Sequence, residues 1–292
     1  MRRDTFLYGT AATLVLAPLR AKAEALESAL RSSIAQIPGS VGIYARTMAP
    51  GPALLAYNAH DAFPAASTIK LLIMLTAYNA QEQAPGALAR RVEIRRSDLV
   101  GGSPFLANAT GGEQFSVADL LVPMIQLSDN SAANALITQF SFERINATAR
   151  RAGLMHTHLR RHFLDYSAIV HHHENVTTAA DMGRLLYAIE RGSREGLRTV
   201  ASSQSCRRMI EIMLGQTDRD KIPAGVPAGV PIANKTGEVD GVRNDVAIVD
   251  PFGDSPFVLC ILTKHLTDYS SALHGISAIS NAVYWRVART GA

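Results

Sequence analysis

Three short groups of polar residues in this chain could carry out acyl-transfer chemistry. The first is Ser67-x-x-Lys70, at the front of an almost unbroken apolar run. Residues three apart on a helix lie on one face, with Cβ atoms about 5–6 Å apart, so this hydroxyl and this amine could meet. Serine needs an adjacent base to act as a nucleophile, and a lysine in an apolar wall has a lowered pKa that suits that role. The alternative interpretation is a helix-capping serine and a lysine that reaches solvent.

The other two groups suit the same chemistry. Ser128-Asp129-Asn130 follows an apolar stretch, and Lys235-Thr236-Gly237 lies in a short strand-like run. The Ser128 hydroxyl could carry a proton to the leaving nitrogen of an amide, a transfer worth about 10²–10⁴ in rate. Lys235 would add positive charge near Ser128 and near a substrate carboxylate, to which Thr236 offers a hydroxyl. Gly237 would let the strand edge approach a ligand closely.

The elements that must position these groups can be read from apolar periodicity. Strands are expected at both ends of the chain, over 41–48, 54–57, 232–236, 245–249 and 257–263, with a short extended segment at 91–94. Helices are expected over 24–37, from Ser67 to about residue 80, and over 116–127, 132–140, 142–152, 177–189, 205–214 and 272–287. Residues 156–173 show no period and are expected to form a long surface loop. This order predicts a helical lobe inserted into an α/β lobe.

The three groups, in this order along the chain, resemble the signature of class A β-lactamases and penicillin-binding proteins. Residues 128–134 and 177–182 also resemble segments of that family, and the resemblance covers roughly residues 25–290. It implies a two-lobed serine β-lactamase-like α/β fold, with a five-stranded antiparallel sheet, flanking terminal helices and an inserted all-helical lobe. The implied single catalytic domain spans 24–292, with the α/β lobe at about 24–62 and 216–292 and the helical lobe at about 63–215.

The implied activity is hydrolysis of β-lactam amides through an acyl-serine intermediate. The expected catalytic residues are Ser67 as nucleophile, Lys70 as base, Ser128 as proton carrier, Lys235 as a positive charge, and Glu238, whose backbone N–H would join that of Ser67 in an oxyanion hole. The expected substrate-binding residues are Asn130, Thr236, Gly237 and Arg243, although Arg243 could equally be a solvated arginine at a strand end. Asp129 and Asn134 are expected to brace loops.

The sequence departs from the family in the Ω-loop, where β-lactamases of this class carry an Arg-aromatic-Glu-x-x-x-Asn pattern and the Glu serves deacylation. Here Phe163 stands at the Glu position and Ser167 at the Asn position. Asp165 is a possible deacylation base, and Glu174 could also reach in. Without such a base the acyl-enzyme would be released slowly, as in a penicillin-binding D-Ala-D-Ala peptidase or an esterase. Glu238 is a second departure, because a carboxylate there would repel an anionic substrate unless it points away or pairs with Arg243.

Two further alternatives keep the motifs but change the function. A non-catalytic ligand-sensing domain on the same fold would not need all of Ser67, Lys70, Ser128 and Lys235, yet all are present. A glutaminase with the Ser-x-x-Lys motif is disfavoured by the third group of residues. The hydrolase interpretation is therefore preferred.

The first 23 residues look like an export signal. Arg2-Arg3 precede an apolar stretch of about 14 residues, too short to span a bilayer, and Ala21-Lys22-Ala23 fits a cleavage site. An uncleaved N-terminal anchor is the alternative. The whole chain has a net charge of +4, but without residues 1–23 it has 25 basic and 24 acidic residues. Nucleic-acid binding is therefore not expected. The mature protein is expected to be a periplasmic or secreted monomer, off the membrane, with a small-molecule substrate.

Cysteine and histidine usage predicts neither a disulfide nor a metal site. Cys260 lies in an apolar strand-like run and Cys206 in a polar helical stretch, which favours two unpaired thiols. Six of the nine histidines fall between His156 and His173. Adjacent ligands on one loop do not readily face one ion, so a solvated loop is expected, with no metal and no cofactor.

Overall fold

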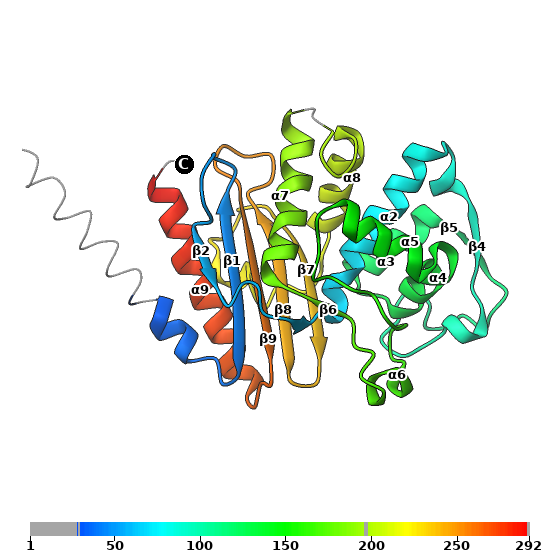
Figure 1. The fold of residues 1–292 in the computed structure, drawn as a ribbon, viewed down its shortest axis with the longest axis horizontal. Helices are drawn as coiled ribbons and strands as arrows, with labels where there is room; N and C mark the ends of the chain where they lie inside the picture. The colour runs from blue at the N-terminus through cyan, green and yellow to red at the C-terminus, as the bar shows by residue number, and fades with distance from the viewer. Residues whose placement is uncertain (1–27, 29, 196–197, 291–292) are drawn as a thin grey trace, which may run out of the picture.

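A five-stranded antiparallel sheet forms one side of the molecule (Figure 1). The computed structural model describes residues 28, 30–195 and 198–290, so the predicted signal over 1–23 lies outside the described residues. The strand order is β2-β1-β9-β8-β7, with bounds β1 Ser40–Thr47, β2 Leu55–Tyr57, β7 Ile232–Val239, β8 Val242–Val249 and β9 Phe257–Lys264. The two ends of the chain thus build one sheet, and β7 is its edge nearest the helical side.

The sheet is buried on both faces because helices cover each of them. In β9, Leu259 and Ile261 pack into the cluster under α9 (Tyr269–Thr290), whereas Val258 and Cys260 face the opposite cluster. This alternation follows from the two-residue period of a strand. Helix α7 (Ala179–Glu195) packs on β1, β8 and β9, on the face of the sheet opposite α9 (Figure 1).

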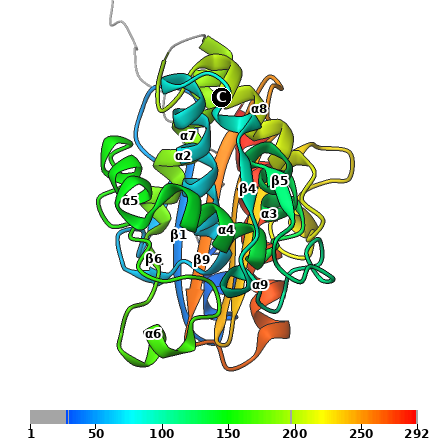
Figure 2. The same cartoon turned by 90° about the vertical axis from the view of Figure 1, so that its right-hand side faces the viewer.

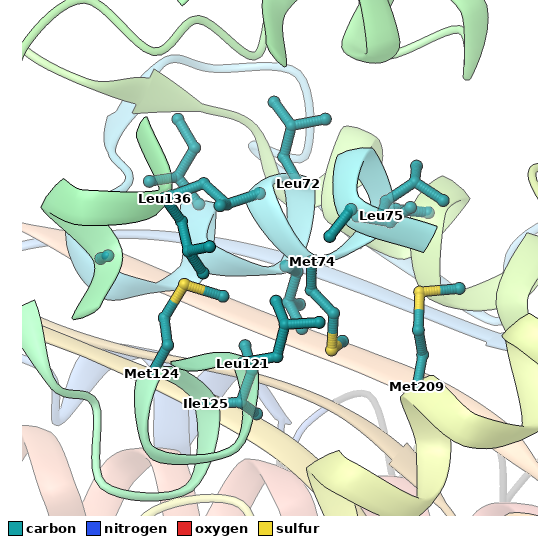
Figure 3. Close-up of a cluster of buried hydrophobic side chains, with 14 of the residues drawn as sticks. Leu72, Met74, Leu75, Leu121, Met124, Ile125, Leu136 and Met209 are labelled. Carbon is teal, nitrogen blue, oxygen red and sulfur yellow. The ribbon is translucent and has the colours of Figure 1, made fainter. Parts of the chain in front are cut away.

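The helical side is organised around α2 (Lys70–Gln83). Residues 71–75 of this helix are fully buried, and such a helix, apolar on all sides, belongs inside a core. Leu72, Met74 and Leu75 contribute to a cluster that also holds Leu136 and Met209 (Figure 3). The surrounding helices are α3 (Val117–Gln126), α4 (Asn130–Phe140), α5 (Phe142–Arg151) and α8 (Ser203–Leu214). Figure 2 shows this side facing the viewer.

Two short strand pairs and one short helix complete this part of the fold. Strand β4 (Arg91–Glu93) pairs with β5 (Gln114–Ser116), and β3 (Phe63–Pro64) pairs with β6 (Val176–Thr177). Helix α6 (Tyr166–Val170) projects from the lower edge of the molecule (Figures 1 and 2). Within the described ranges, no helix combines the length and the hydropathy that crossing a membrane requires.

The predicted fold class is confirmed. The structure has the antiparallel five-stranded sheet and a helix from each end of the described chain beside it, and in the sequence a helical block separates β2 from β7. Cys206 and Cys260 are both buried and free, as predicted. The prediction of an irregular loop over 156–173 was wrong in part, because residues 166–170 form α6. The lobe and domain boundaries stay predictions, and α7, placed in the helical lobe by the sequence, packs on the sheet.

Candidate active site

Ser67 lies in a tight turn rather than in the regular helix that the sequence predicted. A 3₁₀ segment, Ala66–Ile69, precedes α2, which begins only at Lys70. Ala66, directly before the serine, has φ of +45°, a conformation that an L-residue adopts at a cost of about 1–3 kcal/mol. Ser67 is 9% exposed. The backbone is therefore held in a strained turn where the nucleophile is expected.

Lys70 is fully buried, and polar groups of the second motif surround its amine. Lys70 Nζ lies 2.6 Å from the carbonyl oxygen of Ser128, 2.8 Å from Asn130 Oδ1 and 3.2 Å from Ser128 Oγ. Among the described residues, no hydrogen bond joins this amine to the Ser67 hydroxyl, so the direct contact expected from their spacing is not formed. A buried amine needs hydrogen-bond partners, and Ser128 and Asn130 supply them.

The Ser128 hydroxyl lies between two lysines. Lys235 Nζ is 3.1 Å from Ser128 Oγ, on which Lys70 also converges, and Lys235 additionally donates to the carbonyl of Thr236 at 2.8 Å. Ser128 has φ of +56°, which turns the chain sharply between α3 and α4. Groups from three distant parts of the sequence therefore meet at one hydroxyl.

Edge strand β7 lies directly against the Ser67 turn. A Cβ atom at Gly237 would be 3.0 Å from the Ser67 backbone nitrogen and 3.1 Å from the Ala65 carbonyl oxygen. Only glycine therefore fits without displacing that turn. Glu238 follows on the same strand, and its expected place beside the Ser67 N–H in an oxyanion hole stays a prediction.

Burial lowers the pKa of both lysines at this hydroxyl. Loss of solvation is the main cause at Lys70, reinforced by the charge of Lys235, and its pKa falls well below the usual value. At Lys235 burial again dominates, carboxylates including Asp245 oppose it, and the pKa falls to about 7. Burial also raises the pKa of Asp245, which is fully buried and accepts from Asn234 Nδ2 at 3.1 Å, to about 6. Burial thus favours the neutral form of Lys70 relative to an exposed lysine.

These lowered values predict how stability changes with pH. Above about pH 7 the folded protein has released the Lys235 proton, whereas the unfolded chain keeps it to about pH 10, so the unfolded state binds more protons in this window. Unfolding free energy should therefore rise with pH. Between pH 7 and 8.5 the gain from this residue should be on the order of 1–2 kcal/mol. Urea unfolding across this range should show the slope in the native chain and a smaller one in Lys235→Met.

Lys264→Met is the matched control for that measurement. Lys264 sits at the end of β9 and donates to the Ala62 carbonyl at an exposed position. Its replacement should leave the pH slope intact. An equal slope in the native chain and in Lys235→Met would contradict the assignment of the slope to Lys235.

The predicted loop-bracing roles of Asp129 and Asn134 are confirmed. The Asp129 carboxylate accepts from the backbone nitrogens of Phe105 and Leu106 at 2.9 and 3.2 Å, and from that of Ala132 at 2.8 Å. Asn134 Oδ1 accepts from Phe163 N at 2.8 Å, while its Nδ2 donates to the Phe163 carbonyl at 3.3 Å. Asn134 thus fixes the backbone of the residue at the unusual Ω-loop position.

The ring of Phe163 faces the amine of Lys70. Its ring centroid is 4.4 Å from Lys70 Nζ, and the side chain is 7% exposed. A carboxylate at this position would lie against the same amine, which agrees with the predicted placement of Phe163 where the family has a glutamate. The face of Lys70 on this side is therefore covered by an apolar ring.

Neither proposed substitute for that glutamate is free to act as a base in this structure. Asp165 is not among the residues that line the cavity, and its carboxylate caps α6 by accepting from Ala168 N at 3.0 Å. Glu174 does line the cavity, but Arg161 donates to its Oε1 from Nη2 at 2.6 Å and from Nε at 3.1 Å. This ion pair joins the two ends of the loop. In the structure Asp165 has the contact of a helix cap, and its role as a base stays a prediction.

Glu238 pairs with Arg243, as one of the expected alternatives had it, but Lys221 is its nearer partner. Glu238 Oε1 pairs chiefly with Lys221 Nζ at 2.6 Å, and Arg243 Nε is farther away at 3.8 Å. The Arg243 guanidinium stacks on the Tyr269 ring at 3.8 Å and donates to the carbonyls of Val239 and Val242. Arg243 is not among the residues lining the cavity, so the structure does not present it to a substrate carboxylate.

A cavity of about 650 Å³ opens beside these groups. Ser67, Ser128, Asn130 and Thr236 line its catalytic end, whereas Leu164, Tyr166 and Ile169 form an apolar wall supplied by the Ω-loop region. This volume is typical of a site for a drug-sized ligand. The predicted catalytic and substrate-binding side chains thus share one cavity or lie directly against it, apart from Asp165 and Arg243.

Sequence reasoning missed Lys221 and Asp218. Lys221 is 1% exposed and its Nζ lies 2.7 Å from Asp218 Oδ2 as well as 2.6 Å from Glu238 Oε1. The only signal in the sequence is an acidic residue three positions before a lysine, a common surface pattern. Nothing local indicates that this lysine reaches the strand bearing Glu238.

The chain is similar to known proteins over most of its length. The model of the β-lactamase enzyme family matches residues 25–287. The chain is 29% identical to β-lactamase CTX-M-4 of Salmonella typhimurium over 246 residues, covering 83% of this chain and 82% of that protein. A solved β-lactamase from Desulfarculus baarsii is 30% identical, with a TM-score of 0.78, over 90% of this chain and 97% of that one. The solved PBP-A is 25% identical, with a TM-score of 0.80, over 90% and 96%.

Proposed function

The chain belongs to the β-lactamase enzyme family, and we propose that it is a serine hydrolase that opens β-lactam amides through an acyl-Ser67 intermediate. The observation that carries the proposal is the Ser128 hydroxyl held 3.2 Å from Lys70 Nζ and 3.1 Å from Lys235 Nζ, in the cavity that Ser67 lines. No simpler structural role explains two buried lysines converging on one hydroxyl at a cavity wall.

The proposed acylation step begins at Ser67. Its hydroxyl attacks the β-lactam carbonyl carbon, and its proton passes to Lys70, whose pKa is lowered by burial. The negative charge on the carbonyl oxygen would be stabilised by the backbone N–H groups of Ser67 and Glu238, a donor pair in which one member is typically worth about 10²–10³ in rate.

Ring opening then requires a proton on the lactam nitrogen. Once Lys70 carries the Ser67 proton, its ammonium can donate to the Ser128 carbonyl, to Asn130 Oδ1 and to the Ser128 hydroxyl oxygen. Ser128 would pass its proton to the nitrogen as Lys70 returns the one taken from Ser67, while Lys235 stabilises the transient alkoxide. The C–N bond breaks and the acyl-enzyme remains.

A second candidate function is a penicillin-binding peptidase or esterase that acylates in the same way and releases β-lactams slowly. The ring of Phe163 over Lys70 favours it, because this position holds no carboxylate to activate water. The carboxylates lining the described cavity are all engaged: Glu174 with Arg161, Asp218 and Glu238 with Lys221, and Asp240 with the Tyr269 hydroxyl.

One experiment tests the proposal and separates the two candidates. A chromogenic cephalosporin is hydrolysed under steady-state conditions while intact-mass spectrometry follows the adduct. Steady turnover with rapid recovery of free enzyme is expected for the lactamase, and an adduct that persists while turnover stalls supports the peptidase. Neither adduct nor turnover would contradict both.

The proposal extends to location and assembly. The charged and apolar pattern of residues 1–23 supports export to the periplasm or secretion after cleavage near Ala23. We propose a monomer there, with a role in resistance to β-lactams. Mass analysis of the mature N-terminus and light scattering would test these statements.

A further inference from the structure

The charged side chains that line the cavity are mostly acidic. Four carboxylates, Glu174, Asp218, Glu238 and Asp240, face it, against the single guanidinium of Arg161. Arg161 is itself paired with Glu174. Among the described residues that line the cavity, the other three carboxylates, Asp218, Glu238 and Asp240, lie on the β7 side. On that side, no cation among the described residues also lines the cavity.

The nearest cation on that side is already shared. Lys221 is 1% exposed, and its ammonium lies between Asp218 Oδ2 at 2.7 Å and Glu238 Oε1 at 2.6 Å. The two carboxylates remain accessible, with side chains 29% and 45% exposed. Arg243 Nε also lies 3.8 Å from Glu238 Oε1, so Asp218, Glu238 and Asp240 together outnumber the two cations paired with them and leave this wall with a net negative charge.

Other hydrogen-bond donors that could bind a substrate carboxylate on this side already have partners. Arg243 stacks on Tyr269 and donates to backbone carbonyls. Although burial opposes it, hydrogen bonding from Lys221 and from the Thr236 hydroxyl lowers the pKa of Asp218, so this carboxylate stays ionised and engages Thr236. The β7 wall, defined as Asp218, Glu238 and Asp240, is thus rich in acceptors and poor in free donors.

Resting on the function proposed above, we propose that the β7 wall makes the enzyme select zwitterionic acyl donors, which carry a cationic group besides their carboxylate, over donors with net negative charge. A cationic substituent near Glu238 and Asp240 would be attracted, and an additional anion would be repelled. The alternative is that the Glu238 side chain rotates away from Lys221, so that Lys221 binds the substrate carboxylate instead. That arrangement predicts a preference for anionic donors, so the two can be told apart.

The test uses two cephalosporins that share the acyl side chain and differ at the 3′ position, one bearing a pyridinium and the other an acetoxy group. The acylation rate at limiting substrate is measured for each, and their ratio is compared between the native chain and Glu238→Gln. The intrinsic reactivity of the two compounds cancels in this comparison. The preference for the pyridinium compound should fall by about three- to tenfold in Glu238→Gln. It should also fall in the native chain at high salt.

Two further variants, one a second test and one a control, complete the experiment. Asp240→Asn removes a second wall charge and should shift the ratio in the same direction, even if Glu238→Gln folds poorly. Glu211→Gln is the matched control, because Glu211 pairs with Arg208 on the surface of α8, and it should leave the ratio unchanged.

The outcomes separate this inference from the function on which it rests. If neither cephalosporin acylates the protein, the proposed function fails and the inference falls with it. If both acylate but the ratio is the same in the native chain, Glu238→Gln and Asp240→Asn, only the selectivity is overturned. A rise of the pyridinium preference in Glu238→Gln would also overturn it, in favour of a substrate carboxylate that takes Lys221.

Discussion

Replacing Ser67 with alanine is expected to abolish covalent labelling by penicillin and to lower turnover by about 10⁴-fold or more. The reason is chemical: without the hydroxyl no acyl bond can form, whereas the cavity, Ser128 and both lysines remain. Intact-mass spectrometry after exposure to penicillin measures labelling directly, and hydrolysis of a chromogenic cephalosporin measures turnover. Binding without chemistry should persist in this variant.

The control and the contradicting result are both simple for this change. Ser270→Ala removes an exposed hydroxyl on α9 and should label like the native chain. Because Ala66 is held at φ of +45°, thermal unfolding of Ser67→Ala should be compared with that of the native chain to show that the turn survives. Labelling of a folded Ser67→Ala protein would show that another residue is the nucleophile.

The sequence predicted those parts of the fold whose burial produces a recognisable pattern of apolar residues. Strands β8 and β9 are apolar along most of their length because helices cover both faces, and α2 is apolar on every side because it fills the helical core. Such runs are recognisable without any knowledge of what they contact. In the two short strand pairs, β4 with β5 and β3 with β6, each strand has only two or three residues, and of these four strands only β4 was predicted, as the extended segment at 91–94.

Helix α6 was missed for a related reason. It is five residues long and none of them is buried, so no apolar face marks it. Its start is nevertheless set by Asp165, whose carboxylate accepts from Ala168 N. A capping carboxylate and a candidate base look alike in a sequence, and only the direction of the side chain distinguishes them.

At the site, the motifs predicted which residue types meet but not how they pair. The spacing of Ser67 and Lys70 suggested a direct contact, whereas Lys70 turns to Ser128 and Asn130, which come from the next motif. Pairing of Glu238 depends on Lys221, brought to β7 by the loop after α8. Long-range ion pairs of this kind have no local pattern, so the charge of the cavity wall could not be read from the chain.

The largest gain of function is expected from Phe163→Glu. The ring of Phe163 lies 4.4 Å from Lys70 Nζ, and the adjacent backbone is held by Asn134, so a glutamate would place its carboxylate beside Lys70 and near the ester carbonyl of an acyl-Ser67. A positioned general base for water is typically worth about 10²–10⁴ in rate. The lifetime of the penicillin adduct should therefore shorten by about 100-fold or more, followed by intact mass after rapid removal of free penicillin.

Phe163→Gln separates base catalysis from the mere removal of the ring. Glutamine has nearly the shape of glutamate and admits the same water, but it cannot accept the proton of that water at neutral pH. Its adduct should persist far longer than that of Phe163→Glu. The new carboxylate should also raise the pKa of Lys70 through its charge, so acylation is expected to slow while deacylation accelerates. Equal adduct lifetimes for the Glu and Gln variants would contradict the placement of Phe163 at the deacylation position, because only the carboxylate differs between them.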